Sequence, residues 1–343
     1  MKYKINFIDA LFNSEGHFIN DINNFSFLAD KYNLYYFING SISNSSKNIS
    51  KKFTLYQYNK GHSIIKQIVF LFYSFFKINS IDFNYILSTN YISLSVISLF
   101  FRKNIYVLIH FIPTRNLFLY KLILKLLLYR SIGFIFLNEY VMLDFQKKIF
   151  LNKNKQFVIN SRDLNFNSFK LSNNKIKTVL FIGAFNEFKS VDVLIELINT
   201  YYYPNVRFIF ASKGIEKLIP NLITKNTVIV KDDYLSEKDY NDFMDIADFV
   251  FISYIKDYGV RFSGTFIDAV KHSCNTICND LEIFKYFTSK YNTGYIFNNE
   301  NDLHSILLDL KNFDVNPEIY NDFSSKKRES DLLSITKNYF DNL

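Results

Sequence analysis

Tryptophan and cysteine are scarce or absent in this chain of 343 residues. It has no Trp and two Cys residues, Cys274 and Cys278, whereas Phe and Tyr number 39 and 25. Two cysteines cannot form a disulfide framework, and one C-x3-C spacing is weak evidence for a metal site, so a reducing compartment fits best. The abundance of Phe and Tyr indicates an AT-rich coding bias rather than an aromatic binding surface.

Several signatures of nucleotide and hydrolase chemistry are also absent. The sequence has no Gly-x-Gly-x-x-Gly, no Walker loop and no Gly-x-Ser-x-Gly elbow. It also lacks the Asp-x-Asp element that would hold Mn²⁺ or Mg²⁺ against a diphosphate, and Asp232-Asp233 is a poor substitute. We therefore predict chemistry without a metal or a resident cofactor.

No targeting or membrane-spanning segment is predicted. Residues 1–8 form a strand-like run and lack the charged-then-apolar layout of a signal peptide. Residues 83–101 carry no charge, but they contain many Ser, Thr and Asn residues. We interpret that stretch as a strand, a turn and a helix rather than a membrane span.

The charge is divided unevenly between the two halves of the chain. Residues 1–170 hold 21 Lys and Arg against 8 Asp and Glu, a net charge of +13. Residues 171–343 hold 19 against 24, a net charge of −5. This asymmetry and the length favour two domains. The basic half would attract an anionic partner, either a membrane surface or nucleic acid.

Short apolar runs alternate with helix-period segments throughout the chain, which predicts parallel sheets covered by helices. The expected strands are 4–8, 34–37, 85–87, 105–109, 134–137, 157–159, 178–182, 206–211, 227–230, 249–252, 276–278 and 295–297. The expected helices are 18–32, 64–76, 117–129, 140–150, 191–198, 236–244, 265–271 and 303–310. A stretch rich in Asn, Ser and Lys at 160–177 is the expected linker.

The predicted fold is α/β, with two Rossmann-like doubly wound domains facing a cleft. The expected domains are 1–165 and 166–325, with residues 326–343 as a tail or helix that packs back on the first domain. Ligands of doubly wound sheets bind beyond the carboxyl ends of the strands, so polar residues at those positions are the candidates for function.

Two such segments stand out in the second half. In the first, Gly183 closes a strand and Lys189 precedes the next helix, which would give a phosphate a close backbone approach and a cation. In the second, Arg261 precedes the run Ser263-Gly264-Thr265 at an expected helix start, and Asp268 follows one turn later. That arrangement suits an anion at the helix N-terminus and a ribose at the carboxylate. Each segment alone is equally typical of an ordinary capped turn.

Over residues 178–310 the sequence resembles family 4 glycosyltransferases and their GT-B relatives of bacterial polysaccharide and lipopolysaccharide assembly. The family pattern is a glycine-arginine turn followed by Glu-Lys-Gly, and later a Glu-x7-Glu spacing. Gly183 and Lys189 match the first element, and Asp268 matches the second glutamate. Ala184 and Val260 stand where the family has its arginine and its first glutamate.

The resemblance implies donor-binding roles for one set of residues and a ribose contact for Asp268. The set is Gly183, Lys189, Arg261, Ser263, Gly264, Thr265 and Asp268. It implies a nucleotide-sugar donor, most often UDP- or GDP-linked, and retention of anomeric configuration, with the leaving phosphate assisting deprotonation of the acceptor.

In the first half the resemblance is thinner. Glu15, Gly16 and His17 follow the first strand, where the family often has a loop near donor and acceptor. His110 ends the strand 105–109, where the family often places a histidine against the donor sugar or leaving phosphate. We therefore take His110 as the candidate catalytic residue.

Two apolar segments with basic edges, 64–76 and 117–129, are typical of core helices. With the charge of +13, they equally fit a patch that rests on anionic lipid beside a lipid-linked acceptor. The sequence thus predicts a glycosyltransferase of the hexosyltransferase class, cytoplasmic and peripheral on the inner face of the plasma membrane. Its partners would be a nucleotide-sugar donor, a glycan or lipid-linked acceptor and an anionic membrane surface. Nucleic acid is not expected, because no nucleic-acid-binding motif is present.

Two alternatives remain open at this point. One is an inverting transferase of the same fold, with Asp9, Glu15 or His17 as the base. The other is a catalytically inactive GT-B subunit that binds a nucleotide sugar or a partner, which the missing arginine and glutamate favour.

Overall fold

The structure is a computed structural model of the chain. It describes residues 2–11, 22–43, 51–58, 63–79, 81–88, 91–100, 104–109, 118, 121–123, 125, 133–148, 156–159, 175–183, 187–218, 226–259, 261 and 263–342. The chain divides into two compact units, Met1–Ser161 with Lys326–Leu343, and Arg162–Ser325.

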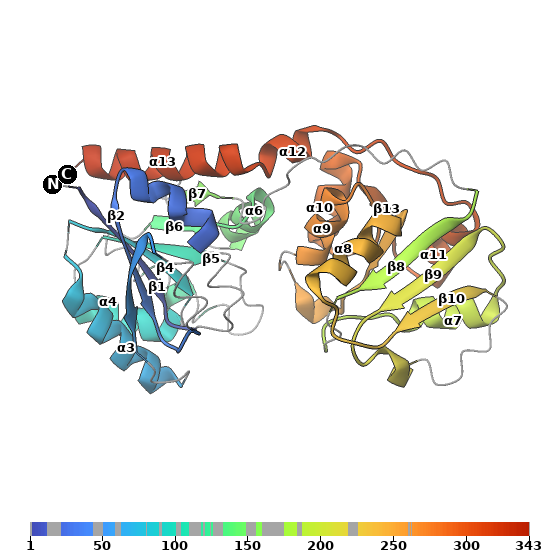
Figure 1. Cartoon of the computed structure of the whole chain (residues 1–343), viewed down its shortest axis with the longest axis horizontal. Coiled ribbons are helices and arrows are strands. Elements are labelled where there is room, and N and C mark those ends of the chain that lie inside the picture. The colour runs from blue at the N-terminus through green and yellow to red at the C-terminus, as the bar shows by residue number, and fades with distance from the viewer. Residues whose placement is uncertain are drawn as a thin grey trace. The chain divides into compact units, whose positions relative to one another are not determined.

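The first unit contains a seven-stranded parallel sheet in the order β3-β2-β1-β4-β5-β6-β7 (Figure 1). The strands are β1 (Lys4–Asp9), β2 (Asn33–Ile38), β3 (Phe53–Gln57), β4 (Phe83–Ser88), β5 (Ile105–Ile109), β6 (Gly133–Phe136) and β7 (Gln156–Val158). The helical elements are η1 (Ser26–Asp30), α3 (Ile64–Lys77), α4 (Tyr91–Phe100), α6 (Glu139–Lys148) and α13 (Ser325–Asp341). The uncharged stretch 83–101 is therefore the strand and helix that its polar residues predicted.

Alternation along the strands divides the side chains of this sheet between two cores. Val107 and Phe134 pack with α3 and α6 on one face. Phe7 and Tyr85 pack on the other, where α13 adds Leu332 and Ile335. Figure 1 shows α13, in red, running along this unit. The C-terminal helix thus completes the core of the N-terminal unit.

The second unit contains a six-stranded parallel sheet in the order β10-β9-β8-β11-β12-β13. The strands are β8 (Lys177–Ile182), β9 (Val206–Ala211), β10 (Thr227–Lys231), β11 (Phe249–Ile252), β12 (Asn275–Asn279) and β13 (Gly294–Phe297). The helical elements are α7 (Asp192–Thr200), η3 (Ile215–Leu218), α8 (Glu237–Ile246), η4 (Lys256–Tyr258), α9 (Gly264–Lys271), α10 (Glu282–Tyr291), α11 (Glu300–Leu308) and α12 (Glu318–Asp322).

Both sheets have the doubly wound strand order, so the predicted fold class of two Rossmann-like α/β domains is confirmed. Ser236 is the N-cap of α8, since its side chain accepts a hydrogen bond from the Asp239 N–H. The edge strand β3 was not predicted. Of the expected helix 117–129, the described residues 118, 121–123 and 125 are helical. Within the described parts of the chain, no helix has the length and apolar character needed to cross a membrane.

Candidate functional site

The site lies at the carboxyl ends of β8 and β11, where the strand order of the second sheet reverses. Ligands of doubly wound sheets bind at such a switch point. The segments that follow these strands pair with each other through an antiparallel bridge between Lys189 and Tyr254. Beside the bridge, the N–H of Ser190 donates to the Ser253 carbonyl at 3.0 Å. The two loops are therefore held together by their backbones.

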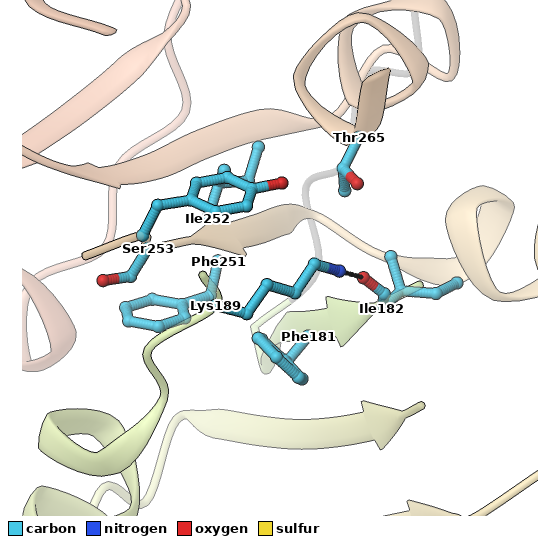
Figure 2. Close-up of a pocket in the computed structure, with 8 residues that line it drawn as sticks. Phe181, Ile182, Lys189, Phe251, Ile252, Ser253 and Thr265 are labelled. Carbon is cyan, nitrogen blue, oxygen red and sulfur yellow. Dashed lines mark hydrogen bonds between the residues drawn. The ribbon is translucent and has the colours of Figure 1, made fainter. Parts of the chain in front are cut away.

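Gly183, Lys189 and Thr265 meet at one point although they come from three segments. Gly183 ends β8 with a φ of +91°, in the region that favours glycine. A Cβ atom on Gly183 would lie 3.1 Å from Lys189 Nζ and 3.7 Å from Thr265 Oγ1. The missing side chain thus leaves room where an ammonium and a hydroxyl converge. Figure 2 shows Lys189 extended past Phe181, with Thr265 on the α9 side of the same space.

A small pocket surrounds this point. It is lined by Phe181, Ile182, Lys189, Phe251, Ile252, Ser253, Tyr254 and Thr265. The pocket is shallow and partly open to solvent. A ligand that uses it would therefore contact it with one group, while most of the ligand lies outside.

The ammonium of Lys189 sits in a mostly apolar environment. It donates a hydrogen bond to the Ile182 carbonyl at 2.7 Å and lies 5.3 Å from the centroid of the Phe181 ring. Burial lowers the pKa of Lys189 to about 8, because desolvation disfavours the charged form. Since an ammonium has three donors, it could donate hydrogen bonds to an anion at this point. The anion would in turn favour the protonated, charged form of the lysine.

Helix α9 begins beside this pocket. Ser263 is its N-cap, and the Ser263 hydroxyl accepts a hydrogen bond from the Phe266 N–H at 3.3 Å and lies 3.2 Å from the Tyr254 hydroxyl. The N–H groups of Gly264 and Thr265 occupy the first turn, where helix geometry supplies no acceptor. Ser263 thus fixes the helix start, and Thr265 in the first turn lines the pocket.

Arg261 stacks on two aromatic rings of the same loops. Its guanidinium is 4.5 Å from the centroid of the Phe188 ring and 5.9 Å from that of Tyr258. Phe188 precedes Lys189 in the chain, and its carbonyl accepts the Ile255 N–H at 2.9 Å. The structure therefore stacks Arg261 on the paired loops, and Arg261 is not among the residues that line the pocket.

Asp268 lies one turn along α9. Its carboxylate accepts a hydrogen bond from the Tyr240 hydroxyl of α8 at 3.0 Å, and the residue is half-buried. The side chain is thus oriented by a neighbouring helix before any ligand binds.

Three residues near the site were not predicted from the sequence. The rings of Tyr254 and Tyr258 stack with centroids 3.8 Å apart, and burial raises the pKa of both hydroxyls. Asn279, at the end of β12, donates to the Tyr254 carbonyl at 2.8 Å and accepts the Tyr254 N–H at 3.2 Å. Asn279 therefore clamps the start of the loop after β11. Its position directly after a predicted strand could have identified Asn279 as a candidate from the sequence.

Of the candidate residues in the first half, the structure describes only Asp9. Glu15, Gly16, His17 and His110 lie outside the described residues. Asp9 is described at the end of β1, where it is buried and accepts a hydrogen bond from the Ser88 hydroxyl. Its contact with Ser88 joins the ends of β1 and β4.

No metal-binding group is found in the described part of the chain. No three His, Cys, Asp or Glu side chains there lie close enough to share an ion. Cys274 and Cys278 are both buried and free, and burial raises the pKa of the Cys278 thiol to about 12. The Cys278 thiol is therefore a poor metal ligand, since a metal needs the thiolate.

Comparison with known proteins identifies the fold and leaves the family unassigned. No protein-family model matches the sequence, and no curated protein matches it significantly. Among solved structures, a glycosyltransferase from Rickettsia africae has a TM-score of 0.70 at 15% identity, covering 100% of both chains. Sucrose-phosphate synthase from Thermosynechococcus elongatus has a TM-score of 0.71 at 11% identity, again covering 100% of both.

A third structure was solved with a nucleotide sugar. HepE from Anabaena, in complex with UDP-glucose, has a TM-score of 0.65 at 13% identity, covering 99% of this chain and 98% of that one. All three are similar to this chain along nearly its whole length. At these identities the likeness establishes the two-domain α/β fold that glycosyltransferases of the GT-B type share.

Proposed function

We propose that the protein is a glycosyltransferase that takes its sugar from a nucleotide-sugar donor bound by the second unit. The observation that carries this proposal is the convergence of Gly183, Lys189 and Thr265 at the switch point of the second sheet. The site offers a partly buried cation and a helix start, and both favour the binding of a phosphate group.

The chemistry proposed for this site is stabilisation of the leaving diphosphate. Negative charge grows on the phosphate as the glycosidic bond to the donor breaks, and a preorganised cation in an apolar pocket stabilises that charge strongly. Lys189 would supply the cation, and the N–H groups of Gly264 and Thr265 would supply further donors. Ser263 would act by fixing the helix start, and Asp268 would bind the ribose.

The remaining assignments follow the family resemblance. We propose a family 4-like enzyme of polysaccharide or lipopolysaccharide assembly, retaining and independent of metal, with a UDP- or GDP-linked donor. The first unit would bind a glycan or lipid-linked acceptor at the cytoplasmic face of the membrane. His110 would contact the donor sugar or its phosphate, with Glu15, Gly16 and His17 in a nearby loop.

Of the three candidate bases for the inverting alternative, the structure describes one, Asp9. A general base must be within reach of the proton it removes, whereas Asp9 is buried and hydrogen-bonded to Ser88. We therefore favour the retaining reaction over one in which Asp9 is the base. An inactive, donor-binding subunit would share the Lys189 pocket and differ only in turnover.

The proposal is tested by binding and then by turnover. UDP, GDP and TDP sugars are screened for an increase in melting temperature, because a ligand that binds only the folded state raises it. The nucleotide that stabilises the protein is then titrated calorimetrically into wild type and Lys189→Ala, with Lys271→Ala, at the far end of α9, as the matched control. Loss of affinity in both variants, or in neither, would place the donor elsewhere.

Turnover separates the transferase from an inactive subunit. Release of nucleoside diphosphate from the stabilising donor is followed with and without membrane extract as a source of acceptor. Acceptor-dependent release with the label recovered in a glycan or glycolipid supports transfer. Donor binding without release in either condition supports the inactive subunit.

A further inference from the structure

Helix α3 is apolar on two faces, only one of which belongs to the core. Phe70, Leu71 and Phe75 are fully buried against the first sheet. A second stripe of Ile65, Val69 and Phe76 recurs at the spacing of one helix face, and Phe72 lies beside it, partly buried against the core. Ile65 and Phe76 are each 74% exposed and Val69 is 41% exposed. A soluble helix normally places polar side chains on its outer face, so this stripe requires an explanation.

The stripe continues onto the neighbouring helix α4. The two helices lie side by side (Figure 1), and the Ser93 hydroxyl donates to the Ile64 carbonyl at 3.3 Å near their N-terminal ends. At the other end, the Phe72 ring lies 5.7 Å from that of Phe100, which is 68% exposed. The exposed apolar surface therefore extends across both helices. We refer to Ile65, Val69, Phe76, Leu99 and Phe100 as the α3–α4 face.

The sequence that contains this face is strongly basic. Residues 31–138 contain 13 Lys and Arg and a single acidic residue, Asp82. Asp82 is buried, and its carboxylate accepts hydrogen bonds from the Asn6 side chain and the Asn79 N–H. On α3 itself, Lys66 and Lys77 are exposed at the edge of the apolar stripe. An apolar stripe with basic edges is complementary to an anionic, partly apolar surface.

From these observations we infer that the α3–α4 face docks on an anionic lipid bilayer, with Ile65, Phe76 and Phe100 inserted at the headgroup boundary and Lys66 and Lys77 on lipid phosphates. The inference deepens the proposed function and rests on it for its purpose, which is to hold the enzyme beside a lipid-linked acceptor. The contact itself requires neither donor nor acceptor.

The same observations disfavour other occupants. A second copy on this face would bring two strongly basic surfaces together, and like-charge juxtaposition weakens association. Nucleic acid would use the lysines and would leave the apolar stripe without a role, since backbone recognition is electrostatic. A bilayer surface uses both features at once.

The experiment uses the full chain and vesicles of defined lipid. Wild type is sedimented with vesicles of phosphatidylcholine alone or with phosphatidylglycerol added, at low and high salt. We expect binding to the anionic vesicles only, and weaker binding as salt screens the lysines.

Ile65→Ser with Phe76→Ser should reduce vesicle partitioning by about tenfold or more, because each removes apolar surface from the interface. Lys66→Gln with Lys77→Gln should reduce it by about fivefold per lysine at low salt.

Matched variants on the second unit control for loss of apolar surface or charge in general. Ile176→Ser with Leu308→Ser removes two exposed apolar side chains there, and Lys238→Gln with Lys271→Gln removes two exposed lysines. Both should bind vesicles like wild type. Equal binding by the α3 variants and their controls would overturn the inference, as would equal binding of wild type to neutral vesicles.

A fluorescent probe places the contact directly. Because both native cysteines are buried, a cysteine introduced by Phe76→Cys can be labelled in the folded protein with an environment-sensitive dye. Its emission should shift to the blue on anionic vesicles, and a dye at Leu308→Cys should not respond. A shift that depends on protein concentration without vesicles would instead indicate a second copy and overturn the inference.

Donor binding is measured in parallel on the same variants without vesicles. The α3 variants should bind the donor nucleotide like wild type, since Lys189 lies in the other unit. Vesicle binding without nucleotide binding in wild type would contradict the proposed function and leave the docking face intact. Nucleotide binding without vesicle binding would contradict only the docking face.

Discussion

The ammonium of Lys189 donates a hydrogen bond to the carbonyl oxygen of Ile182 at 2.7 Å, across the end of the strand that Gly183 closes. This bond points the side chain back over the end of β8 and not outward into solvent. The lysine is thereby positioned where an incoming anion can share its protons with the backbone. Five predictions rest on this arrangement and on the residues around it.

Replacing Lys189 by Met should weaken binding of the donor nucleoside diphosphate and lower turnover by roughly 2–4 kcal/mol in transition-state free energy, because a preorganised charge is lost. Met keeps an apolar chain in the Phe181 contact. Calorimetry with nucleoside diphosphate, monophosphate and inorganic pyrophosphate measures the effect on each part of the ligand. Affinities equal to those of wild type would show that the diphosphate does not bind here.

The depressed pKa of Lys189 predicts a pH dependence of ligand binding. The free lysine titrates near pH 8, and a bound diphosphate favours its protonated form. Affinity for the nucleoside diphosphate should therefore fall as pH rises above about 8, and binding in that range should take up protons. Titration calorimetry in buffers of different ionisation enthalpy detects the uptake. The Lys189→Met variant should show neither effect.

The same pKa has a consequence for stability in the absence of ligand. The folded value near 8 lies below the ordinary lysine value of 10.5, so the unfolded chain binds more protons between them. The contribution of Lys189 to the free energy of unfolding should thus increase with pH above 8, by about 1–2 kcal/mol up to pH 9.5. Higher pH is avoided because Tyr254 and Tyr258, whose pKa values are raised, act with the opposite sign. Denaturant unfolding of wild type against Lys189→Met isolates the lysine.

Much of this arrangement can be predicted from local sequence. The alternation of apolar runs predicted both sheets, and the positions of Gly183, Lys189 and Thr265 after strands predicted the site that the fold assembles. What local sequence could not predict depends on distant pairing. The clamp of Asn279 on Tyr254 joins residues that only the register of β11 beside β12 brings together. The short edge strand β3 has five residues, and its pairing with β2 is what identifies it as a strand.

Asp268 should affect recognition of the nucleoside and leave that of the phosphates unchanged. Its carboxylate is held by the Tyr240 hydroxyl at 3.0 Å, one turn along α9 from the pocket. Asp268→Ala should weaken binding of nucleoside mono- and diphosphates by similar factors and leave pyrophosphate affinity unchanged. Tyr240→Phe removes the orienting bond and keeps the carboxylate, so its effect should be smaller. Loss of pyrophosphate binding in Asp268→Ala would contradict a ribose role.

The sharpest test of the pocket is a pair of glycine substitutions with the same backbone cost. Gly183 and Gly214 have φ angles of +91° and +88°, where a side chain is strained by roughly 1–2 kcal/mol. A Cβ at Gly183 would lie 3.1 Å from the Lys189 ammonium and would fill the space where the anion is proposed to approach, whereas a Cβ at Gly214 would have nothing within 4 Å. Gly183→Ala and Gly214→Ala should therefore lose similar amounts of stability.

Only the Gly183 substitution should impair function. We expect Gly183→Ala to lower affinity for pyrophosphate and for the donor nucleotide, because its methyl group occupies the ligand's position and displaces Lys189. Gly214→Ala should bind both like wild type once the stability difference is taken into account. Denaturant unfolding gives the shared backbone cost and calorimetry gives the difference in binding. If both variants bind equally well, the space beside Gly183 serves only the turn, and the anion must bind at another strand end.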